Sequence, residues 1–216
     1  MKNKGKRIPG LLLTTVLTIM VLGACGQDTK DITVKDDTGK NETAQKQDET
    51  QKEEQAPSKL GSRTNPVPFQ KTATIDDELY NDQGDAFPIK FDLTVEEVTR
   101  GDAAYQKLKA MNEFNEPAPQ GYEWMLVKAK VKFVKSETQD LSFNIDGIMN
   151  FEMVSESGDI YSGDGDIFGT TEPAFSFEMY VGNEKEGYIA NLVKTGEKTQ
   201  LRYEEMVGGQ VFFNLQ

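Results

Sequence analysis

A run of twelve residues, 124–135, alternates between apolar and lysine side chains and limits the fold more than any other feature of the chain. The two alternating sets are Val127, Ala129, Val131 and Phe133 on one side and Lys128, Lys130 and Lys132 on the other. A period of two residues is that of a β-strand, whose successive side chains point to opposite faces of the sheet. We therefore expect a strand with one face in a core and the other in water.

Shorter runs with the same period occur elsewhere in residues 61–216. The clearest are 89–95, 175–181, 188–192 and 211–215, and the weaker ones are 69–75, 148–154 and 199–203. Turn-forming residues cluster between several of them. Seven or eight short strands, each with one wet face, predict a mainly β fold, an antiparallel β-sandwich. A parallel sheet would need helices between its strands, and the pattern shows a single helix.

That inserted helix is predicted from Asp102 to about Phe114, with Asp102 as its N-cap. Its apolar side is formed by Ala104, Leu108 and Met111. Pro117 and Pro119 end it. One interpretation is that the helix closes an end of the sandwich core. The alternative is a lid or a partner-binding edge.

The first 24 residues have the pattern of a bacterial export signal. Basic residues within 1–7 precede an apolar run, 11–22. As a helix, this run would span roughly 18 Å, well short of a hydrocarbon core of about 30 Å. We therefore expect a cleaved signal peptide, 1–24, and no permanent membrane span. The run ends in Leu22-Gly23-Ala24-Cys25, which resembles the lipobox of bacterial lipoproteins.

The lipobox resemblance implies that the Cys25 thiol accepts a diacylglycerol carrying fatty acyl chains such as palmitate. It also implies that a signal peptidase cuts between Ala24 and Cys25. Two or more acyl chains give stable anchoring, because each buried methylene contributes about 0.8 kcal/mol. The expected partner is thus the membrane itself, through Cys25, and the expected location is the extracellular face of the cell membrane. The sequence leaves open whether the new amino group of Cys25 is acylated.

Residues 25–60 are predicted to be a disordered acidic linker that follows the lipidated cysteine. From Gly26 to Lys59 there is no aromatic residue, and Ile32 and Val34 are the only aliphatic residues larger than alanine. Such a segment buries too little apolar surface to offset the entropy lost on ordering. As a coil it would span roughly 30–35 Å. The folded domain is therefore predicted to occupy 61–216.

Charge and composition exclude several classes of function. The chain has 24 Lys and Arg against 36 Asp and Glu, a formal net charge of -12, and residues 61–216 hold 14 against 27. An acidic surface repels phosphate backbones, so we expect no nucleic-acid partner. One cysteine and no histidine exclude Ser-His-Asp and Cys-His catalysis and remove the commonest zinc ligand. We expect no catalytic residues, no cofactor and no enzymatic activity.

One loop, 158–169, carries three aspartates among glycines: Asp159, Asp164 and Asp166. Calcium prefers oxygen ligands on a bendable backbone. An EF-hand that begins at Asp164 fails, because Phe175 stands where the twelfth position needs an acid. Two interpretations stay open: a looser calcium site, for which these aspartates are weak candidates, and a polar hairpin loop.

Two short segments resemble a known family. They are 61–66 (Gly-Ser-Arg-Thr-Asn-Pro) and 114–124 (Phe-Asn-Glu-Pro-Ala-Pro-Gln-Gly-Tyr-Glu-Trp). Together they resemble a family of immunoglobulin-like domains of unknown function on Gram-positive lipoproteins, related in fold to a secreted immunoprotective extracellular antigen. The resemblance covers 61–216 and implies an immunoglobulin-like sandwich, but no catalytic residue. Relatives often carry glycine just before the first strand, where this chain has Gln70. This difference affects only the first turn. Arg63 is expected to pair with a carboxylate and fix the start of the domain.

These patterns predict a membrane-anchored surface lipoprotein whose extracellular domain is a non-catalytic interaction module. The sandwich edges, the end loops or the helix would hold a protein of the cell envelope. The alternative is a surface lipoprotein that binds a small ligand or calcium, at the aspartate loop or in a pocket at one end of the sandwich.

Overall fold

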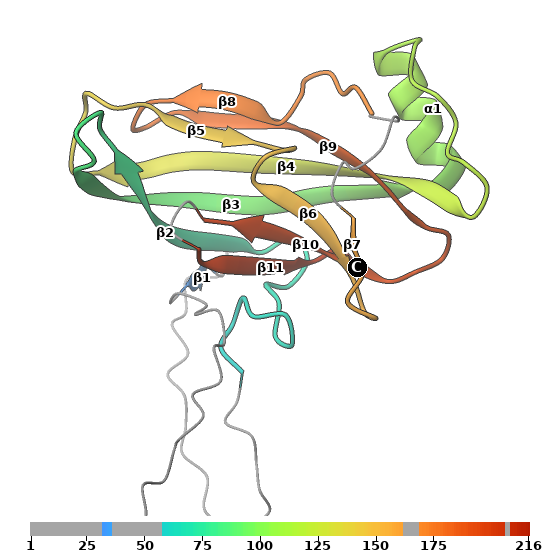
Figure 1. Cartoon of the computed structure of the whole chain (residues 1–216), viewed down its shortest axis with the longest axis horizontal. Helices are drawn as coiled ribbons and strands as arrows, with labels where there is room; N and C mark the ends of the chain where they lie inside the picture. Colours follow the sequence, from blue (N-terminus) through green and yellow to red (C-terminus); the bar gives the residue numbers. More distant parts are fainter. Residues whose placement is uncertain (1–31, 36–57, 162–168, 206–207) are drawn as a thin grey trace, which may run out of the picture.

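Antiparallel strands in packed layers dominate the computed structural model, which describes residues 32–35, 58–161, 169–205 and 208–216 (Figure 1). The first layer is a five-stranded sheet. Its strands, in spatial order, are β1 (Thr33–Lys35), β2 (Thr72–Tyr80), β3 (Ala86–Arg100), β4 (Tyr122–Ser136) and β9 (Glu184–Lys194). Every pair within it is antiparallel.

The second layer is a four-stranded sheet, and a small third sheet completes the enclosure of the core. The second layer runs β11 (Gln210–Asn214), β10 (Thr199–Glu204), β6 (Phe151–Ser155) and β7 (Ile160–Tyr161), and the third pairs β5 (Phe143–Asp146) with β8 (Ser176–Met179). The rings of Phe91 and Tyr203 meet between the two layers, with centroids 5.4 Å apart. The predicted mainly β, antiparallel sandwich with one inserted helix is confirmed.

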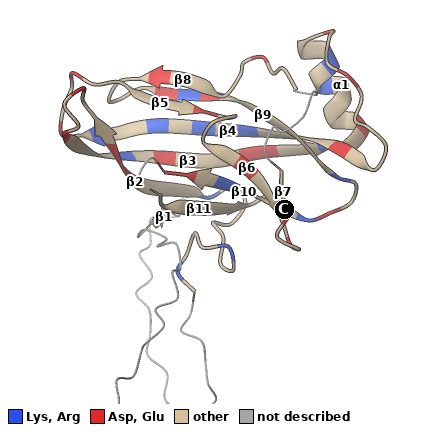
Figure 2. Ribbon diagram, in the orientation of Figure 1, with Lys and Arg blue, Asp and Glu red and all other residues tan. Residues whose placement is uncertain are grey.

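The alternation in β4 matches the prediction. The apolar set from Val127 to Phe133 is fully buried in the main core. The lysines of the opposite face form a ladder with glutamates of β3 and β9 (Figure 2). Lys128 Nζ lies 3.0 Å from a carboxylate oxygen of Glu186 and 3.3 Å from one of Glu96. Such solvent-facing pairs contribute about 0–1 kcal/mol each, so the ladder specifies register more than it stabilises the fold.

Helix α1 (Gly101–Met111) covers a second, smaller core on the outer face of the first sheet. Its buried residues Ala104 and Leu108 pack against Trp124 and Leu126. For this reason the first part of β4 is buried on both faces. The indole Nε1 of Trp124 donates to the Glu116 carbonyl at 2.9 Å. The helix therefore covers the outer face of the first sheet and adds no buried residue to the main core between the layers, unlike the predicted closure of one end of that core.

The helix boundaries differ from the predicted ones. The predicted N-cap, Asp102, lies inside the first turn, and the position of the N-cap is taken by Arg100, with no side-chain capping bond. The helix ends at Met111, three residues before Phe114, where the amide of Asn112 donates to the Leu108 carbonyl. Asp102 still stabilises the helix, because a carboxylate in the first turn interacts favourably with the helix dipole.

The described residues hold more strands than the seven or eight predicted, because β1, β5 and β7 are too short to show a clear period. Two other predicted runs are displaced. The run 69–75 corresponds to the later strand β2, and 148–154 divides into a turn and β6. The predicted disordered linker, 25–60, is wrong for 33–35, which form β1. Its remaining residues up to 57, apart from Ile32, lie outside the described residues, as do the predicted signal peptide, Ala24 and Cys25.

The start of the domain is fastened to the second layer by backbone bonds. The Val67 amide donates to the Phe212 carbonyl at 2.8 Å. Arg63 contributes differently from the prediction, because its guanidinium donates to the main-chain carbonyls of Ser155 and Glu156, at 3.3 and 2.9 Å, and pairs with no carboxylate among the salt bridges described. No helix in the described ranges is both long and apolar enough to cross a membrane.

Candidate interaction surface

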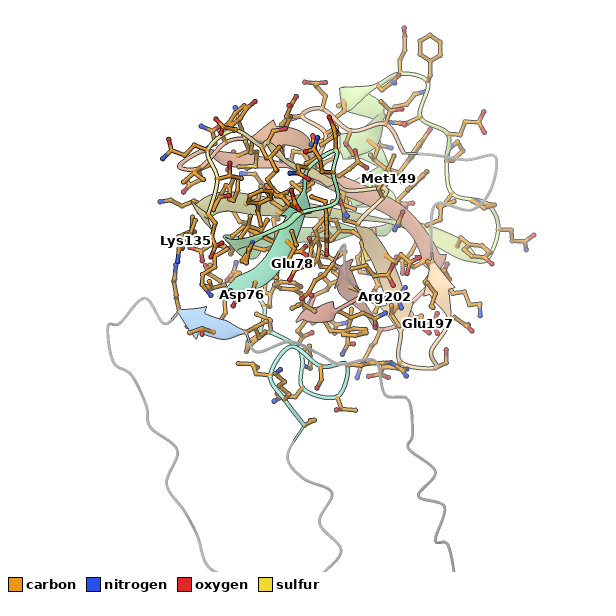
Figure 3. All side chains as sticks on the ribbon, turned by 60° about the vertical axis from the view of Figure 1, so that its left-hand side comes forward. Asp76, Glu78, Lys135, Met149, Glu197 and Arg202 are labelled. Carbon is orange, nitrogen blue, oxygen red and sulfur yellow. The ribbon has the colours of Figure 1, made fainter. Side chains whose placement is uncertain are left out.

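The turn between β5 and β6 holds two large apolar side chains in solvent. Ile148 is 68% exposed, and Met149, labelled in Figure 3, is 80% exposed. The amides of both residues donate to Oδ1 of Asp146, at 2.8 and 3.1 Å. Asn150 exchanges two further bonds of 2.9 Å with the main chain of Asp146. Four hydrogen bonds therefore fix this turn, so the exposure of its apolar tip is built in.

An apolar groove of about 330 Å³ lies beside this turn. Its walls come from the turn itself, from the extended segment 169–176 and from β9. Their apolar lining residues are Ile148, Ala174, Phe175, Ile189 and Ala190. We call the groove, together with Ile148 and Met149, the turn–groove surface.

Main-chain hydrogen bonds hold the groove walls together. The Phe175 amide donates to the Tyr188 carbonyl at 3.0 Å, and the Tyr188 amide donates to the Pro173 carbonyl at 2.9 Å. The Gly147 amide donates to the Phe175 carbonyl at 2.6 Å. A Cβ on Gly147 would lie 3.0 Å from Ile189 and 3.2 Å from the Phe175 carbonyl oxygen. These tight contacts explain why position 147 is a glycine. The groove is thus a preformed feature of packed backbone.

The groove carries little charge. Among the described residues that line it, Asp146 is the only one charged at neutral pH. Burial on its own would raise the pKa of the Asp146 carboxyl, but hydrogen bonds from the Ser176 side chain and from the Ile148 and Met149 amides outweigh it. The pKa therefore lies below its usual value. The groove accordingly presents one fixed negative charge at the edge of an apolar surface.

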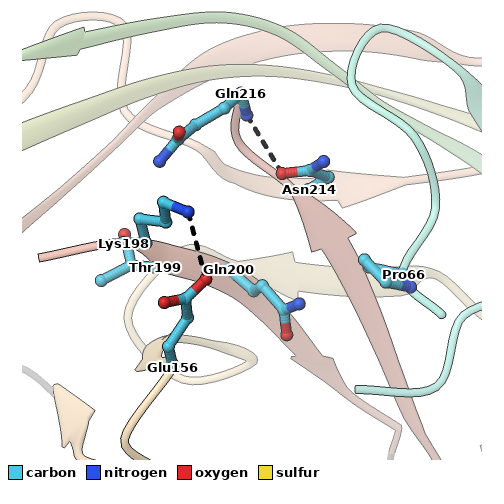
Figure 4. A pocket seen from close by; sticks show the side chains of 7 residues that line it. All are labelled: Pro66, Glu156, Lys198, Thr199, Gln200, Asn214 and Gln216. Carbon is cyan, nitrogen blue, oxygen red and sulfur yellow. Dashed lines mark hydrogen bonds and ion pairs between the residues drawn. The ribbon is translucent and has the colours of Figure 1, made fainter. Parts of the chain in front are cut away.

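A second depression, of about 240 Å³, lies near the carboxyl terminus (Figure 4). Its lining is polar and comes from Pro66, Glu156, Lys198, Thr199, Gln200, Asn214 and Gln216. The ion pair between Lys198 and Glu156 spans 3.5 Å, with both side chains about two-thirds exposed. Hydrated groups in this arrangement gain little from binding a ligand, so the turn–groove surface is the stronger candidate.

The aspartates proposed as weak calcium ligands are only partly placed. Asp159 is described, and its Oδ2 lies 2.6 Å from Nζ of Lys194. Asp164 and Asp166 lie outside the described residues. No group of three or more carboxylate or thiol side chains suited to a metal occurs in the part of the chain that is described. The calcium site therefore stays a prediction.

A buried polar cluster that the sequence analysis missed crosses the core. The Tyr203 hydroxyl donates to Oδ2 of Asp77 at 2.8 Å, and both residues are at most 2% exposed. Burial, and then the charge of Asp77, raise the pKa of Tyr203 well above its usual value. Asp77 could have been noticed, because it shares the inward phase of β2 with Ile75. It is enclosed, so it fixes the core and does not form a surface site.

Two solved structures resemble this chain. One is a candidate lipoprotein (ycdA) from Bacillus subtilis subsp. subtilis strain 168, with 15% identity and a TM-score of 0.37 over 64% of this chain and 38% of that chain. The other is MPT63, a secreted protein from Mycobacterium tuberculosis, with 10% identity and a TM-score of 0.41 over 69% of this chain and 97% of that chain. The chain thus spans well under two thirds of the first protein.

No known family profile and no curated protein matches the chain. The family that the sequence resembles is therefore not shown for this chain. Identities of 10–15% and TM-scores below 0.5 are too low to assign a function.

Proposed function

We propose that the chain is a lipid-anchored, non-catalytic interaction module on the extracellular face of the cell membrane, and that the turn–groove surface binds a protein of the cell envelope. The observation that carries the proposal is the rigid display of Ile148 and Met149 beside a preformed apolar groove. Exposed apolar side chains in such an arrangement are typical of protein-binding sites. Stable interfaces commonly centre on a few anchors of this kind.

The chemistry of the surface suggests the chemistry of the partner. The groove is lined by apolar side chains with Asp146 at its edge, and residues 61–216 carry 14 Lys and Arg against 27 Asp and Glu. An acidic surface attracts basic partners and repels acidic ones. We infer an apolar segment flanked by lysine or arginine.

The proposed location rests on the lipobox at Leu22–Cys25. A Cys25→Ser chain should leave the membrane fraction, because the acyl acceptor is gone. The direct check is mass spectrometry of the wild-type chain extracted from membranes. We expect Cys25 as the first residue, carrying a diacylglyceryl group. An unmodified thiol together with an intact Met1 would contradict the anchor.

The partner site can be tested by photo-crosslinking in intact cells. A benzoylphenylalanine at Met149 should give one discrete adduct, and Ile148→Asp in the same chain should abolish it. The matched control is the same amino acid at Tyr180, which is 51% exposed but lies outside the groove. The crosslinked peptide of the partner should be apolar with flanking basic residues. Equal adducts at both positions, or an adduct indifferent to Ile148→Asp, would contradict the proposed site.

A further inference from the structure

β1 lies on the outer edge of the first sheet, although its residues belong to the predicted linker (Figure 1). It pairs antiparallel with β2 over three residues, with Thr33 opposite Thr74 and Lys35 opposite Thr72. Val34 and the preceding Ile32 pack against the main core. Lys35 forms an ion pair with Asp92 on the outer face. Backbone, apolar and charged contacts thus all act on one short segment.

The seat of Ile32 is shaped to accept a side chain. Gly61 has a φ of +87°, and a Cβ there would collide with the Ile32 side chain, next to Val211. Any other residue at position 61 would both strain the backbone and fill this seat. The start of the folded domain therefore contributes a specific contact to the linker segment.

The edge of β2 offers hydrogen-bonding groups at alternate residues. The Asn81 amide donates to the Asp85 carbonyl across the turn that joins β2 to β3, and the pairing continues without a shift to Thr72. In an antiparallel pair the hydrogen-bonded positions alternate, so the odd-numbered residues of β2 face β3. Thr72 and Thr74 consequently turn their main-chain groups outward, to β1.

This edge is closed a short distance beyond β1. The outward amide of Glu78 donates to Oδ1 of Asp77 at 2.9 Å, and Asp77 is held in place by Tyr203. A side chain that satisfies an edge amide blocks the pairing of a further strand there, as inward-pointing charges do at many sheet edges. The accepting edge therefore has a defined length and takes a short strand.

We propose that the outer edge of β2, with the seat beside Gly61, is a strand-binding site whose occupant is this chain's own segment 32–35. Only seven residues separate Cys25 from Thr33, which limits the Cα–Cα span between them to about 26–29 Å. Without β1, the 33 steps from Cys25 to Ser58 would allow a span of about 110 Å. Docking of this segment thus sets the reach of the domain from its first anchored residue. The consequence at the membrane rests on the proposed lipid attachment, whereas the docking does not.

The test uses Cys25, the sole cysteine, as the site of a nitroxide label on the unlipidated chain that begins there. Paramagnetic broadening of amide signals is measured by NMR against the reduced label. We expect strong broadening at the β2–β3 hairpin, around 76–86. Ile32→Asn/Val34→Asn should weaken it several-fold, whereas the solvent-facing control Thr33→Asn should retain it. Unchanged signals in β4 and β10 would verify that each variant is folded.

Two results would overturn the proposal. One is the same broadening in the wild type and in the double variant. The other is broadening of an isotope-labelled, diamagnetic chain by a spin-labelled second copy, since the strand would then come from another molecule. Because the protein is unlipidated in this experiment, failure here is separate from failure of the anchor, which mass spectrometry decides.

Discussion

The hydroxyl of Tyr203 in β10 donates a 2.8 Å hydrogen bond to Asp77 in β2, and so joins the two layers through the core. The other oxygen of Asp77 accepts from the Glu78 amide. One buried carboxylate therefore serves both the packing of the layers and the closure of the sheet edge.

Tyr203→Phe removes a donor from this buried carboxylate and should lower the free energy of unfolding by about 1–3 kcal/mol. Urea unfolding measures the change. The control, Tyr180→Phe, alters an exposed side chain and should stay within about 0.5 kcal/mol of wild type. If both variants unfold alike, the cross-layer bond does not contribute as described.

Trp124→Ala should be the most damaging of the single substitutions considered. The side chain is 1% exposed and fills the small core under α1, and deletion of a buried tryptophan costs about 3–5 kcal/mol. Calorimetry or urea unfolding would show the loss, and amide exchange should rise first in α1. Phe114→Ala is the matched control, because Phe114 is 82% exposed. A comparable loss of stability in Phe114→Ala would contradict the assignment of Trp124 to the core and of Phe114 to the surface.

Alkaline pH should destabilise the protein through Tyr161. Burial, and then the hydrogen bond to Glu197, raise the pKa of Tyr161 to about 12. Since an unfolded tyrosine titrates near 10, this stabilisation is complete below about pH 10 and is lost as the pH rises towards 12. Urea midpoints measured across this range should fall less steeply in Tyr161→Phe, and also in Glu197→Gln. Tyr203 also has a raised pKa, so some slope should remain. If the urea midpoints of both variants fell as steeply with pH as those of the wild type, the Tyr161–Glu197 pair would not be a cause of the alkaline destabilisation.

Acid should weaken the turn that carries Ile148 and Met149. The lowered pKa of Asp146 means that its stabilisation is present above the pKa of an unfolded aspartate and is lost as the pH falls through the folded value. Asp146→Ala should cost about 1–3 kcal/mol at neutral pH, because two main-chain amides lose a charged acceptor. It should also flatten the acid limb of the stability curve. Ile148→Ser is the control for the turn, because it keeps all four hydrogen bonds and should be nearly neutral.

The strands with a fully buried face could be predicted from the sequence, whereas the turn–groove surface could not. β4 and β3 alternate over long stretches, and burial on one side imposes that period. The turn at Asp146–Asn150 was not predicted, because Ile148 and Met149 extend the apolar run of β6 towards the N-terminus. Composition cannot distinguish an apolar residue in a strand from one held outward by an aspartate that accepts two main-chain bonds.

The two remaining surprises did leave traces in the sequence. Asp77 occupies an inward position of β2 between apolar neighbours, so its burial follows from the period. Ile32 and Val34, the only large aliphatic residues between 26 and 59, are two residues apart, as in a strand. Three paired residues are too few to distinguish a docked strand from coil on pattern alone, because their stability comes from a site formed by distant residues such as Gly61 and Asp92.

The docking of β1 gives the chain the topology of a closed ring. Lys35 and Ser58, which residues 36–57 join covalently, both belong to the same folded body. A protease that cuts within 36–57 would break the covalent path from Cys25 to the domain, but the severed fragment would still hold the domain through β1. With the lipid that we propose on Cys25, shedding into the medium would then require two events, cleavage and the release of one short strand.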